Sequence, residues 1–264
     1  MRIVIKLGGT LLEDQAARDA IAKQLAHVAL SHALAVVHGG GKQVTRYLED
    51  RGVKSRFVGG LRVSDERVIE AVTNVIAGGV NKQLVAALIA QGAAAVGISG
   101  VDGPLTTAAP LRPDLGYVGE PKKTNGALFD LLIGGKFIPV VACIAGDEKG
   151  AIYNVNADQM AVSCAVGWGA DALIFLTDVA GVKDATGRVM NHLTAEEAKK
   201  LIESGVAHGG MQAKLEAANM ALEAGLRAVT IASGRQADVC ERLLAGEAIG
   251  TTLSANKTIT EVHA

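Results

Sequence analysis

The chain has 264 residues, of which 49% are apolar, 20% charged and 3% aromatic. This is the composition of a globular protein, and the length allows one large α/β domain or two lobes. The 26 basic and 27 acidic side chains leave a formal net charge of −1, so neither the charge nor the aromatic content favours a protein that binds nucleic acid.

Strands and helices alternate in the first half of the predicted fold. Arg2–Leu7 and Ala33–His38 are apolar runs of strand length, and the apolar residues of 15–31 recur at helical spacing between them. Two strands joined by a helix form a βαβ unit, which places the strands parallel in one sheet. The further predictions in this half are helices at 43–49, 65–91 (with a break near Gly78-Gly79) and 126–132, strands at 93–99 and 137–143, and irregular hairpins at 52–61 and 106–121.

The second half continues this alternation. A strand is predicted at Ala172–Thr177, and Thr194 with Glu197 three residues later has the pattern of a capping box that begins a helix. The remaining predictions are helices at 158–166, 194–204, 211–224 (closed by Gly225) and 236–244, and a strand at 228–232. The sequence therefore predicts a three-layer αβα sandwich around a mainly parallel, open central sheet, with two lobes at 1–148 and 149–264.

The first residues and the cysteines predict a cytoplasmic protein. Met1-Arg2 leads directly into the first strand, and Lys6 interrupts the apolar run too early for a signal peptide. No run of 18 apolar residues occurs, so no membrane span is expected. The three cysteines lack the spacing of a metal or redox motif, and we expect buried, reduced thiols at Cys143, Cys164 and Cys240.

Glycine-rich turns follow the first two predicted strands. Gly8-Gly9 comes after the first strand and Gly39-Gly40-Gly41 after the second, each before a predicted helix. Backbone N–H groups in such turns, at the carboxyl ends of parallel strands, favour an anion site, although the same glycines also suit simple tight turns. The spacing matches neither a Walker A loop, since Gly41-Lys42 is followed by Gln43, nor a GxGxxG dinucleotide fingerprint.

Two basic side chains near these turns are candidates for anion binding. Lys6 lies within the apolar first strand, where its burial would require an anionic partner; a lysine on an edge strand that reaches solvent is the alternative. Arg62 lies in a glycine-flanked segment, and its planar guanidinium suits a carboxylate, although a surface arginine has the same spacing.

Polar residues before two later helices are further candidates. Asn154, Asn156 and Asp158 alternate at the start of a predicted helix, where an asparagine also suits an N-cap and an aspartate also complements the helix dipole. Lys214 falls in the first turn of its predicted helix, the unfavourable end for a cation unless an acidic group or a phosphate lies nearby. Asp178 follows the strand Ala172–Thr177, again at a carboxyl end.

Five motifs, taken together and in this order, resemble those of a known family. They are Lys6-Leu7-Gly8-Gly9, His38-Gly39-Gly40-Gly41, Gly60-Leu61-Arg62-Val63, Asn154-Val155-Asn156-Ala157-Asp158, and Gly209-Gly210-Met211 followed by Lys214. With these motifs the chain resembles the amino acid kinase family, and within it the N-acetylglutamate kinases of arginine biosynthesis. The resemblance extends from Lys6 to about Thr252, nearly the whole chain.

The resemblance implies a reaction. The γ-phosphoryl group of ATP would be transferred to the side-chain carboxylate of N-acetyl-L-glutamate, giving N-acetyl-L-glutamyl 5-phosphate. An anionic nucleophile needs no general base, so catalysis would come from positioning and from neutralisation of charge.

The resemblance also implies roles for individual residues. Lys6 and Lys214 would be catalytic and would stabilise the transferring phosphoryl group, while Asp158 would orient both lysines. The acetylated substrate would be held by Gly40, Gly41, Arg62 and Asn154, with Arg62 on the α-carboxylate. The phosphoryl and nucleotide side would include the backbone N–H groups of Gly8, Gly9 and Gly41, together with Asp178, Lys183 and Met211.

Cofactor and assembly follow from the same resemblance. Magnesium is expected through the ATP phosphates rather than through a dedicated carboxylate site. In this family a long helical extension before the first strand accompanies hexamers that arginine inhibits, and this sequence has no such extension. The resemblance therefore implies a homodimer insensitive to arginine, with dimerisation and acetylglutamate binding in lobe 1–148 and ATP binding in lobe 149–264. No nucleic-acid or membrane partner is expected.

Two alternatives stay open. A related kinase of lysine biosynthesis acts on α-aminoadipate attached to an acidic carrier protein. Four basic side chains would suit a rim for such a carrier, although solvation explains them equally well: Lys54, Arg56, Lys122 and Lys123. A non-catalytic amino-acid-binding regulator would have the same fold, but the presence of Lys6, Asp158 and Lys214 together argues against it.

Overall fold

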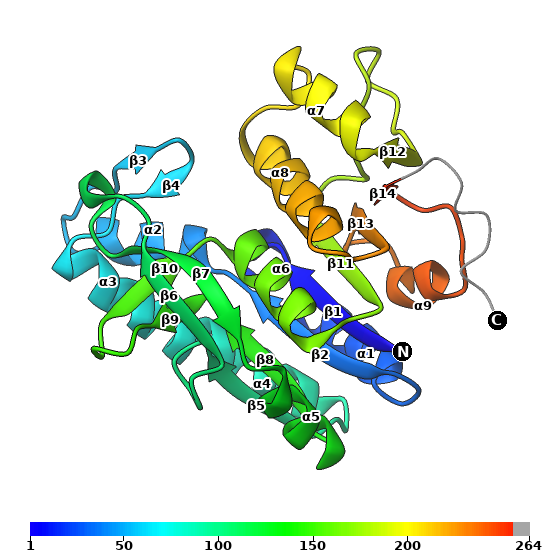
Figure 1. Ribbon diagram of the computed structural model, residues 1–264. Helices are drawn as coiled ribbons and strands as arrows, with labels where there is room; N and C mark the ends of the chain where they lie inside the picture. The colour runs from blue at the N-terminus through cyan, green and yellow to red at the C-terminus, as the bar shows by residue number, and fades with distance from the viewer. Residues whose placement is uncertain (256–264) are drawn as a thin grey trace.

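Eight strands form the central sheet of the computed structural model, which describes residues 1–255 (Figure 1). In spatial order they are β12 (His192–Thr194), β14 (Thr251–Ser254), β13 (Ala228–Ser233), β11 (Ala172–Thr177), β1 (Arg2–Leu7), β2 (Ala33–His38), β8 (Ile138–Ala142) and β5 (Ala95–Ser99). Neighbouring strands are parallel except for β13 and β14, which are antiparallel. The predicted mainly parallel sheet is confirmed.

The central strand β1 separates two sets of strands. On one side β2, β8 and β5 come from the first half of the chain, and on the other side β11, β13, β14 and β12 come from the second half. In open α/β sheets this kind of switch point places a crevice beyond the carboxyl ends of the strands. The part of the predicted second lobe at 256–264 lies outside the described residues.

Helices cover both faces of the sheet, as a three-layer sandwich requires (Figure 1). The hydrophobic cluster on one face includes residues of α2 (Gly41–Glu49), α3 (Glu66–Val72), α5 (Gly126–Gly134), α6 (Ala157–Trp168), α7 (Ala195–Glu203) and α8 (Gly209–Glu223). The cluster on the other face includes η1 (Gly9–Leu12), α1 (Gln15–Val28), α4 (Asn81–Ala90) and α9 (Val239–Leu244). Because successive side chains of a strand point to opposite faces, Ile3, Ile5 and Leu7 belong to the second cluster, whereas Val4 belongs to the first.

One long helix differs from its prediction. The break expected near Gly78-Gly79 is absent, because the chain continues from α3 through the π-helical segment η2 (Thr73–Val80) into α4. The whole helix, Glu66–Ala90, has the length and apolar composition of a membrane-crossing helix. Its buried residues, such as Val68 and Leu84, belong to the two cores of the sandwich, which is the environment of a core helix.

Two smaller groups of strands lie beside the sheet. β6 (Thr106–Pro110), β7 (Val118–Thr124), β9 (Ile144–Gly146) and β10 (Ile152–Val155) form a closed four-stranded set, with η3 (Pro113–Leu115) between β6 and β7. β3 (Phe57–Val58) and β4 (Leu61–Arg62) form a short antiparallel hairpin. Both predicted hairpins are confirmed, but β9 and β10, together with the edge strand β12 and its neighbour β14, were not predicted.

Local capping signals explain several helix ends. The Thr194 and Glu197 side chains form the predicted capping box at the start of α7. Gly225 follows α8 with a φ of 98°, a conformation that glycine adopts without strain. Helix α8 begins at Gly209, two residues before its predicted start, so Lys214 lies two residues deeper in the helix than expected, in the second turn.

Candidate active site

A cavity of about 220 Å³ opens beyond the carboxyl ends of β1 and β2. Strand ends, the start of α2, the β3–β4 hairpin, the long helix and the start of α6 all contribute to its wall. Among the lining residues are six of the predicted site residues: Lys6, Gly9, Gly40, Gly41, Arg62 and Asn154. The structure therefore brings together the two glycine turns and the two basic side chains that the sequence separates by up to 56 positions.

The two glycine turns lie side by side at this cavity. A Cβ atom on Gly9 would lie 4.0 Å from the Gly41 nitrogen, and a Cβ on Gly41 would meet no atom within 4 Å. Helix α2 begins at Gly41, and the first N–H groups of a helix have no partner within it. The start of α2 thus offers free donors to an anion in the cavity.

Gly8 has a different part from the one expected. Its N–H donates to the Leu176 carbonyl of β11 at 2.8 Å, and a Cβ on Gly8 would lie 3.3 Å from the same oxygen. The N–H that we expected at a phosphoryl oxygen is therefore engaged in the sheet. Gly8 allows β1 and β11 to approach closely at the point where both strands end.

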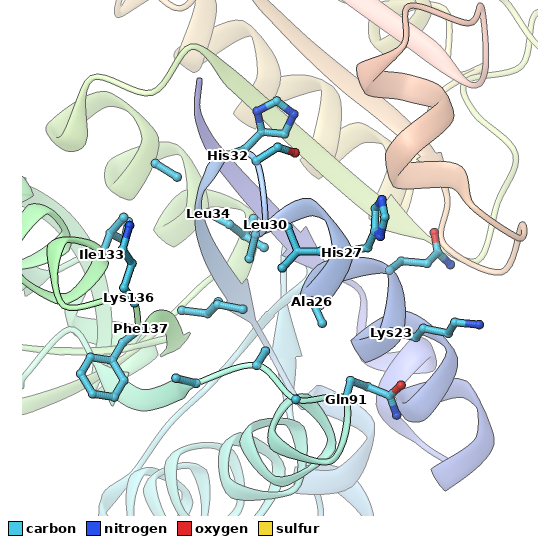
Figure 2. A pocket seen from close by; sticks show the side chains of 18 of the residues that line it. Lys23, Ala26, His27, Leu30, His32, Leu34, Gln91, Ile133, Lys136 and Phe137 are labelled. Carbon is cyan, nitrogen blue, oxygen red and sulfur yellow. The ribbon is translucent and has the colours of Figure 1, made fainter.

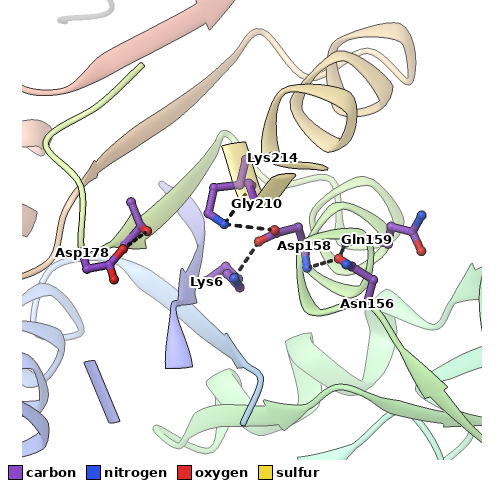
Figure 3. Close-up of polar contacts among 8 residues, drawn as sticks. Lys6, Asn156, Asp158, Gln159, Asp178, Gly210 and Lys214 are labelled. Carbon is purple, nitrogen blue, oxygen red and sulfur yellow. Dashed lines mark hydrogen bonds and ion pairs between the residues drawn. The ribbon is translucent and has the colours of Figure 1, made fainter. Parts of the chain in front are cut away.

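Lys6, Asp158 and Lys214 form one charged cluster at the edge of the cavity (Figure 3). Lys6 Nζ lies 2.6 Å from Asp158 Oδ1, and Lys214 Nζ lies 3.4 Å from Asp158 Oδ2. The side chains of Lys6, Asp158 and Lys214 are only 8%, 7% and 15% exposed. One carboxylate thus holds two ammonium groups from β1 and α8, and the cluster keeps one net positive charge.

Local structure explains why these side chains meet. Lys6 points to the same face of β1 as Val4, and this face is covered by α6 and α8. The Asn156 side chain accepts hydrogen bonds from the N–H groups of Asp158 and Gln159 at 2.9 and 3.2 Å, which makes it the N-cap of α6. Asp158 therefore lies in the first helical turn, where the helix dipole favours a negative charge.

Burial and charge act in opposite directions on the pKa values of this cluster. Burial alone would raise the pKa of Asp158, but the charges of Lys6 and Lys214 and their hydrogen bonds hold it below its ordinary value. Burial lowers the pKa of Lys214, and the charge of Lys6 lowers it further, whereas Asp158 opposes both effects. The carboxylate is ionised at neutral pH, as an anchor for two ammonium groups must be.

Arg62 forms a second cationic centre in the same cavity. It is 8% exposed, and its guanidinium donates to the Gly41 carbonyl and to Thr45 Oγ1, both at 2.7 Å, and to Ser55 Oγ. The Phe57 ring lies 4.7 Å from the guanidinium carbon. All of these contacts are neutral, and no carboxylate lies within ion-pair distance of Arg62 among residues 1–255. Burial lowers the pKa of Arg62, although the charge of Glu49 acts in the opposite direction. A buried guanidinium without a counter-ion is a site for an anionic group.

Asn154 is tied to the same centre through a serine. Its side-chain N–H donates to Ser64 Oγ at 3.1 Å, and Ser64 Oγ donates to the Arg62 carbonyl at 2.9 Å. β10 carries Asn154 and β4 carries Arg62. The closed four-stranded set and the β3–β4 hairpin are therefore joined at the cavity.

Asp178 is the predicted nucleotide residue that lies next to the charged cluster. Figure 3 shows Asp178 and Asp158 on opposite sides of Lys214. Burial acts to raise the pKa of Asp178, but hydrogen bonds from its own backbone, Thr177 and Thr10 lower it. Lys183 is exposed, and Met211 is half-buried against the core. Of these three residues only Asp178 acts electrostatically on Lys214.

Comparison with known proteins identifies the family. The model of the amino acid kinase family matches residues 1–233. The chain belongs to the amino acid kinase family. It is 55% identical to the acetylglutamate kinase of Solibacter usitatus over 254 residues, which cover 96% of this chain and 99% of the relative. The acetylglutamate kinase of Koribacter versatilis is 42% identical over 259 residues, with 97% and 99% covered.

Solved structures show the same fold. An N-acetylglutamate synthase from Neisseria gonorrhoeae, crystallised with coenzyme A and N-acetylglutamate, superimposes with a TM-score of 0.84 at 26% sequence identity. That match covers all of this chain and 62% of the synthase chain. A carbamate kinase from Giardia shares the fold at 17% identity, with a TM-score of 0.70 over 96% of this chain.

Several site residues of this amino acid kinase could not be found from the sequence. Thr45 and Ser55 hold Arg62, Ser64 joins Arg62 to Asn154, and His38 is bonded to Asn81 behind the glycine turn. Only the i, i+4 spacing of Gly41 and Thr45 was a local signal. Within residues 1–255, no group of three or more His, Cys, Asp or Glu side chains is placed to hold a metal ion.

A larger cavity of this kinase, about 880 Å³, lies at the other end of the strands, near their amino ends (Figure 2). Leu30, Phe137, Lys23 and Lys136 are among the residues that line it. It contains none of the predicted site residues.

Proposed function

We propose that the protein catalyses the ATP-dependent phosphorylation of N-acetyl-L-glutamate on its side-chain carboxylate, the acyl-phosphate-forming step of arginine biosynthesis. The observation that carries this proposal is the Lys6–Asp158–Lys214 cluster next to a cavity that contains a buried arginine, which has no carboxylate within ion-pair distance among residues 1–255. The acetylglutamate kinases that are similar over nearly the whole chain support the same reaction.

The charged cluster suits phosphoryl transfer between two anions. An oxygen of the substrate carboxylate attacks the γ-phosphorus, the bond from phosphorus to the ADP oxygen breaks, and no proton has to be removed. The transferred group carries negative charge throughout, so cations that are already in position lower the barrier. Lys6 and Lys214 are the catalytic residues of the proposal, and Asp158 keeps their ammonium groups at fixed places.

The second cationic centre suits the other end of the substrate. In the proposal Arg62 binds the α-carboxylate, and Asn154 and the backbone of Gly40 and Gly41 bind the remaining polar groups. The apolar part of the cavity wall, which includes Val72 and Val118, would receive the acetyl group and the methylene chain.

The nucleotide belongs on the far side of the lysine pair. We assign ATP to the lobe formed by 149–255, with Gly9 at the phosphoryl group and with Asp178, Lys183 and Met211 near the nucleotide. The phosphates of ATP would bring the magnesium ion, which neutralises phosphate charge when it is bound.

A carrier-linked substrate is less well supported than free acetylglutamate. The basic rim that such a carrier would need includes Lys122, which pairs with Glu120, and Arg56, whose guanidinium donates to the Asp114 carbonyl at 3.5 Å. Two relatives that are 55% and 42% identical over nearly the whole chain are also named for acetylglutamate.

A hydroxamate assay tests the function. Purified protein, ATP, magnesium and hydroxylamine are combined with N-acetylglutamate, glutamate, aspartate or α-aminoadipate. Hydroxylamine traps an acyl phosphate as a hydroxamate, which is measured as its coloured complex with ferric iron. We expect rapid product formation with N-acetylglutamate. A faster reaction with any other acceptor, or binding of acetylglutamate without ATP turnover, would overturn the proposal.

We also infer a homodimer, formed through the β5 edge of the sheet. β5 is an edge strand without a charged side chain, and four of its five residues are half-buried. Beside it, Ile89 on α4 is 57% exposed. An apolar, unpaired edge next to an apolar helix surface requires a cover in water.

Light scattering tests the homodimer and should give twice the chain mass for the wild type. The double variant Ile89→Asp with Val96→Lys should give the single-chain mass. A wild-type monomer would contradict the inference.

A further inference from the structure

His38 is a fully buried histidine at the carboxyl end of β2, directly before the glycine turn. Its Nδ1 atom lies 2.9 Å from the Gly39 carbonyl, and its Nε2 atom lies 2.9 Å from the side-chain nitrogen of Asn81. The same nitrogen of Asn81 lies 2.9 Å from the Val140 carbonyl. Asn81 is 1% exposed, so this hydrogen-bonded group is closed to solvent.

The partners fix the protonation state of the imidazole. The Asn81 amide nitrogen has two hydrogens, one for the Val140 carbonyl and one for His38 Nε2, which must therefore accept. His38 then carries its proton on Nδ1 and donates it to the Gly39 carbonyl. Burial, together with a smaller effect of the charge of Lys82, lowers the pKa of His38 to about 4 despite the hydrogen bond to Gly39.

The long helix reaches the glycine turn in two places. Asn81 is the first residue of α4, and the π-helical segment η2 ends immediately before it. From that segment, Ile76 and Val80 approach within 3.2 and 3.3 Å of the place where a Cβ on Gly40 would be. The long helix therefore holds the turn in two ways: by an apolar contact at Gly40, and by hydrogen bonds from Asn81 through His38 to the Gly39 carbonyl. π-helical turns often occur where a helix serves a functional site.

We propose that His38 and Asn81 are positioning residues for phosphoryl transfer, which hold the Gly39–Gly41 turn so that its N–H groups face the reacting carboxylate and phosphoryl oxygens. The inference rests on the proposed function. Neither side chain touches the cavity, so both act through the backbone of the turn. A displacement of the order of 1 Å at such donors lowers rates by roughly 10²-fold.

The first test is Asn81→Leu, assayed with N-acetylglutamate and ATP. We expect kcat to fall by about 10- to 100-fold, while the KM for ATP changes by less than about threefold because the nucleotide side of the cluster is untouched. The matched control is Asn219→Leu, another buried asparagine, whose side chain donates to the Ala195 carbonyl in a helix pair away from the turn. The control should lose similar thermal stability and keep its kcat.

The second test is Asn81→Asp, which separates positioning from simple loss of packing. A carboxylate only accepts hydrogen bonds, so His38 must donate from Nε2. If His38 is also to keep its hydrogen bond from Nδ1 to the Gly39 carbonyl, both ring nitrogens must carry a proton. The ring is then an imidazolium, which the new carboxylate stabilises. Lys82, which donates to Asn81 Oδ1 at 3.0 Å and is the charged side chain acting on His38 among the described residues, would oppose this charge.

The pH profile of the second variant decides the question. The ratio of kcat between Asn81→Asp and Asn81→Leu should rise as the pH falls from 8 to 6, and the His38 ring signals in NMR should titrate over the same range. Parallel pH profiles of the two variants would overturn the inference, as would a kcat of Asn81→Leu within threefold of the wild type. If the wild type itself forms no acyl phosphate, the proposed function fails first and the inference falls with it.

Discussion

One cavity lies at the amino ends of the sheet strands and another at their carboxyl ends, and the smaller one has the features of an active site. We call these two sides of the sheet the amino edge and the carboxyl edge. At the amino edge the cavity measures about 880 Å³, and its ion pair between His27 and Glu241 has side chains that are 61% and 46% exposed. At the carboxyl edge the cavity measures about 220 Å³, and the charges beside it are buried. Charges that are held away from water act on a bound anion much more strongly than exposed charges do. The burial of charged side chains is therefore a better indicator of an active site than the volume of a cavity.

The largest expected effect comes from the ammonium groups of the carboxyl edge. Lys6→Ala and Lys214→Ala should each lower kcat by about 10²- to 10³-fold or more, since each removes a cation already positioned for the transition state. Steady-state assays of acyl phosphate formation measure this loss. Lys136→Ala, at the amino-edge cavity, is the matched control and should stay within about twofold of the wild type. Equal losses at the two edges would refute the contrast between them.

A smaller loss is expected for the carboxylate that holds both lysines. Asp158→Asn should lower kcat by about 10²-fold, because the two ammonium groups then repel each other without an anchor. It should also remove a pH-dependent part of the stability. The pKa of Asp158 is below its ordinary value of 3.8 in the folded protein, so its stabilisation is complete above pH 3.8 and is lost as the pH falls.

Urea unfolding of wild type and Asp158→Asn at several pH values measures this part. The difference in unfolding free energy should be largest near neutral pH and should shrink below about pH 4. A difference that stays constant from pH 7 to pH 3 would show that Asp158 does not form the ion pairs in solution.

Arg62 should affect substrate binding more than the rate of the chemical step. Arg62→Lys keeps the charge but loses the planar fork that the neutral acceptors hold, so the KM for N-acetylglutamate should rise by about 10-fold or more, with a smaller change in kcat. Arg56→Lys, an exposed arginine on the same segment, is the control. An effect confined to the KM for ATP would place Arg62 on the wrong side of the site.

The smallest effect is expected for a residue that only supports Arg62. Thr45→Val removes the hydroxyl that accepts from the guanidinium at 2.7 Å and donates to the Gly41 carbonyl at 3.0 Å. Loss of one such hydrogen bond costs about 1 kcal/mol, so the KM for N-acetylglutamate should rise by roughly fivefold. An unchanged KM would mean that Ser55 and the Gly41 carbonyl hold Arg62 without help.

Periodicity and capping signals predicted most of the sheet and its helices because these patterns are local. β1, β2 and β11 begin and end as predicted, and the alternation along β1 also explains where Lys6 points. The short strands β12 and β14 were missed because their pairing depends on distant partners. Gly78-Gly79 was misinterpreted as a break, since packing against the sheet overrides the weak helix propensity of glycine.

The motifs identified the candidate site residues, but they did not show most of the contacts among them. The resemblance implied that Asp158 orients both lysines, and the structure shows these contacts. That Gly8 uses its N–H within the sheet follows only from the placement of elements far apart in the chain. Ser55, Ser64 and Asn81 had no signal of their own, and Thr45 had only its i, i+4 spacing from Gly41, because a hydroxyl or an amide becomes significant only when its partner is known.

The strand order around β1 has a consequence for how such a scaffold can diversify. In the proposed function, the loops that bind the acceptor follow β2 and its neighbours, the loops that bind the nucleotide follow β11 and its neighbours, and the strand that carries Lys6 lies between the two sets of strands. Loops on one flank can be rebuilt without moving the other, so an exchange of the acceptor flank alone would retarget the phosphate while leaving nucleotide recognition intact.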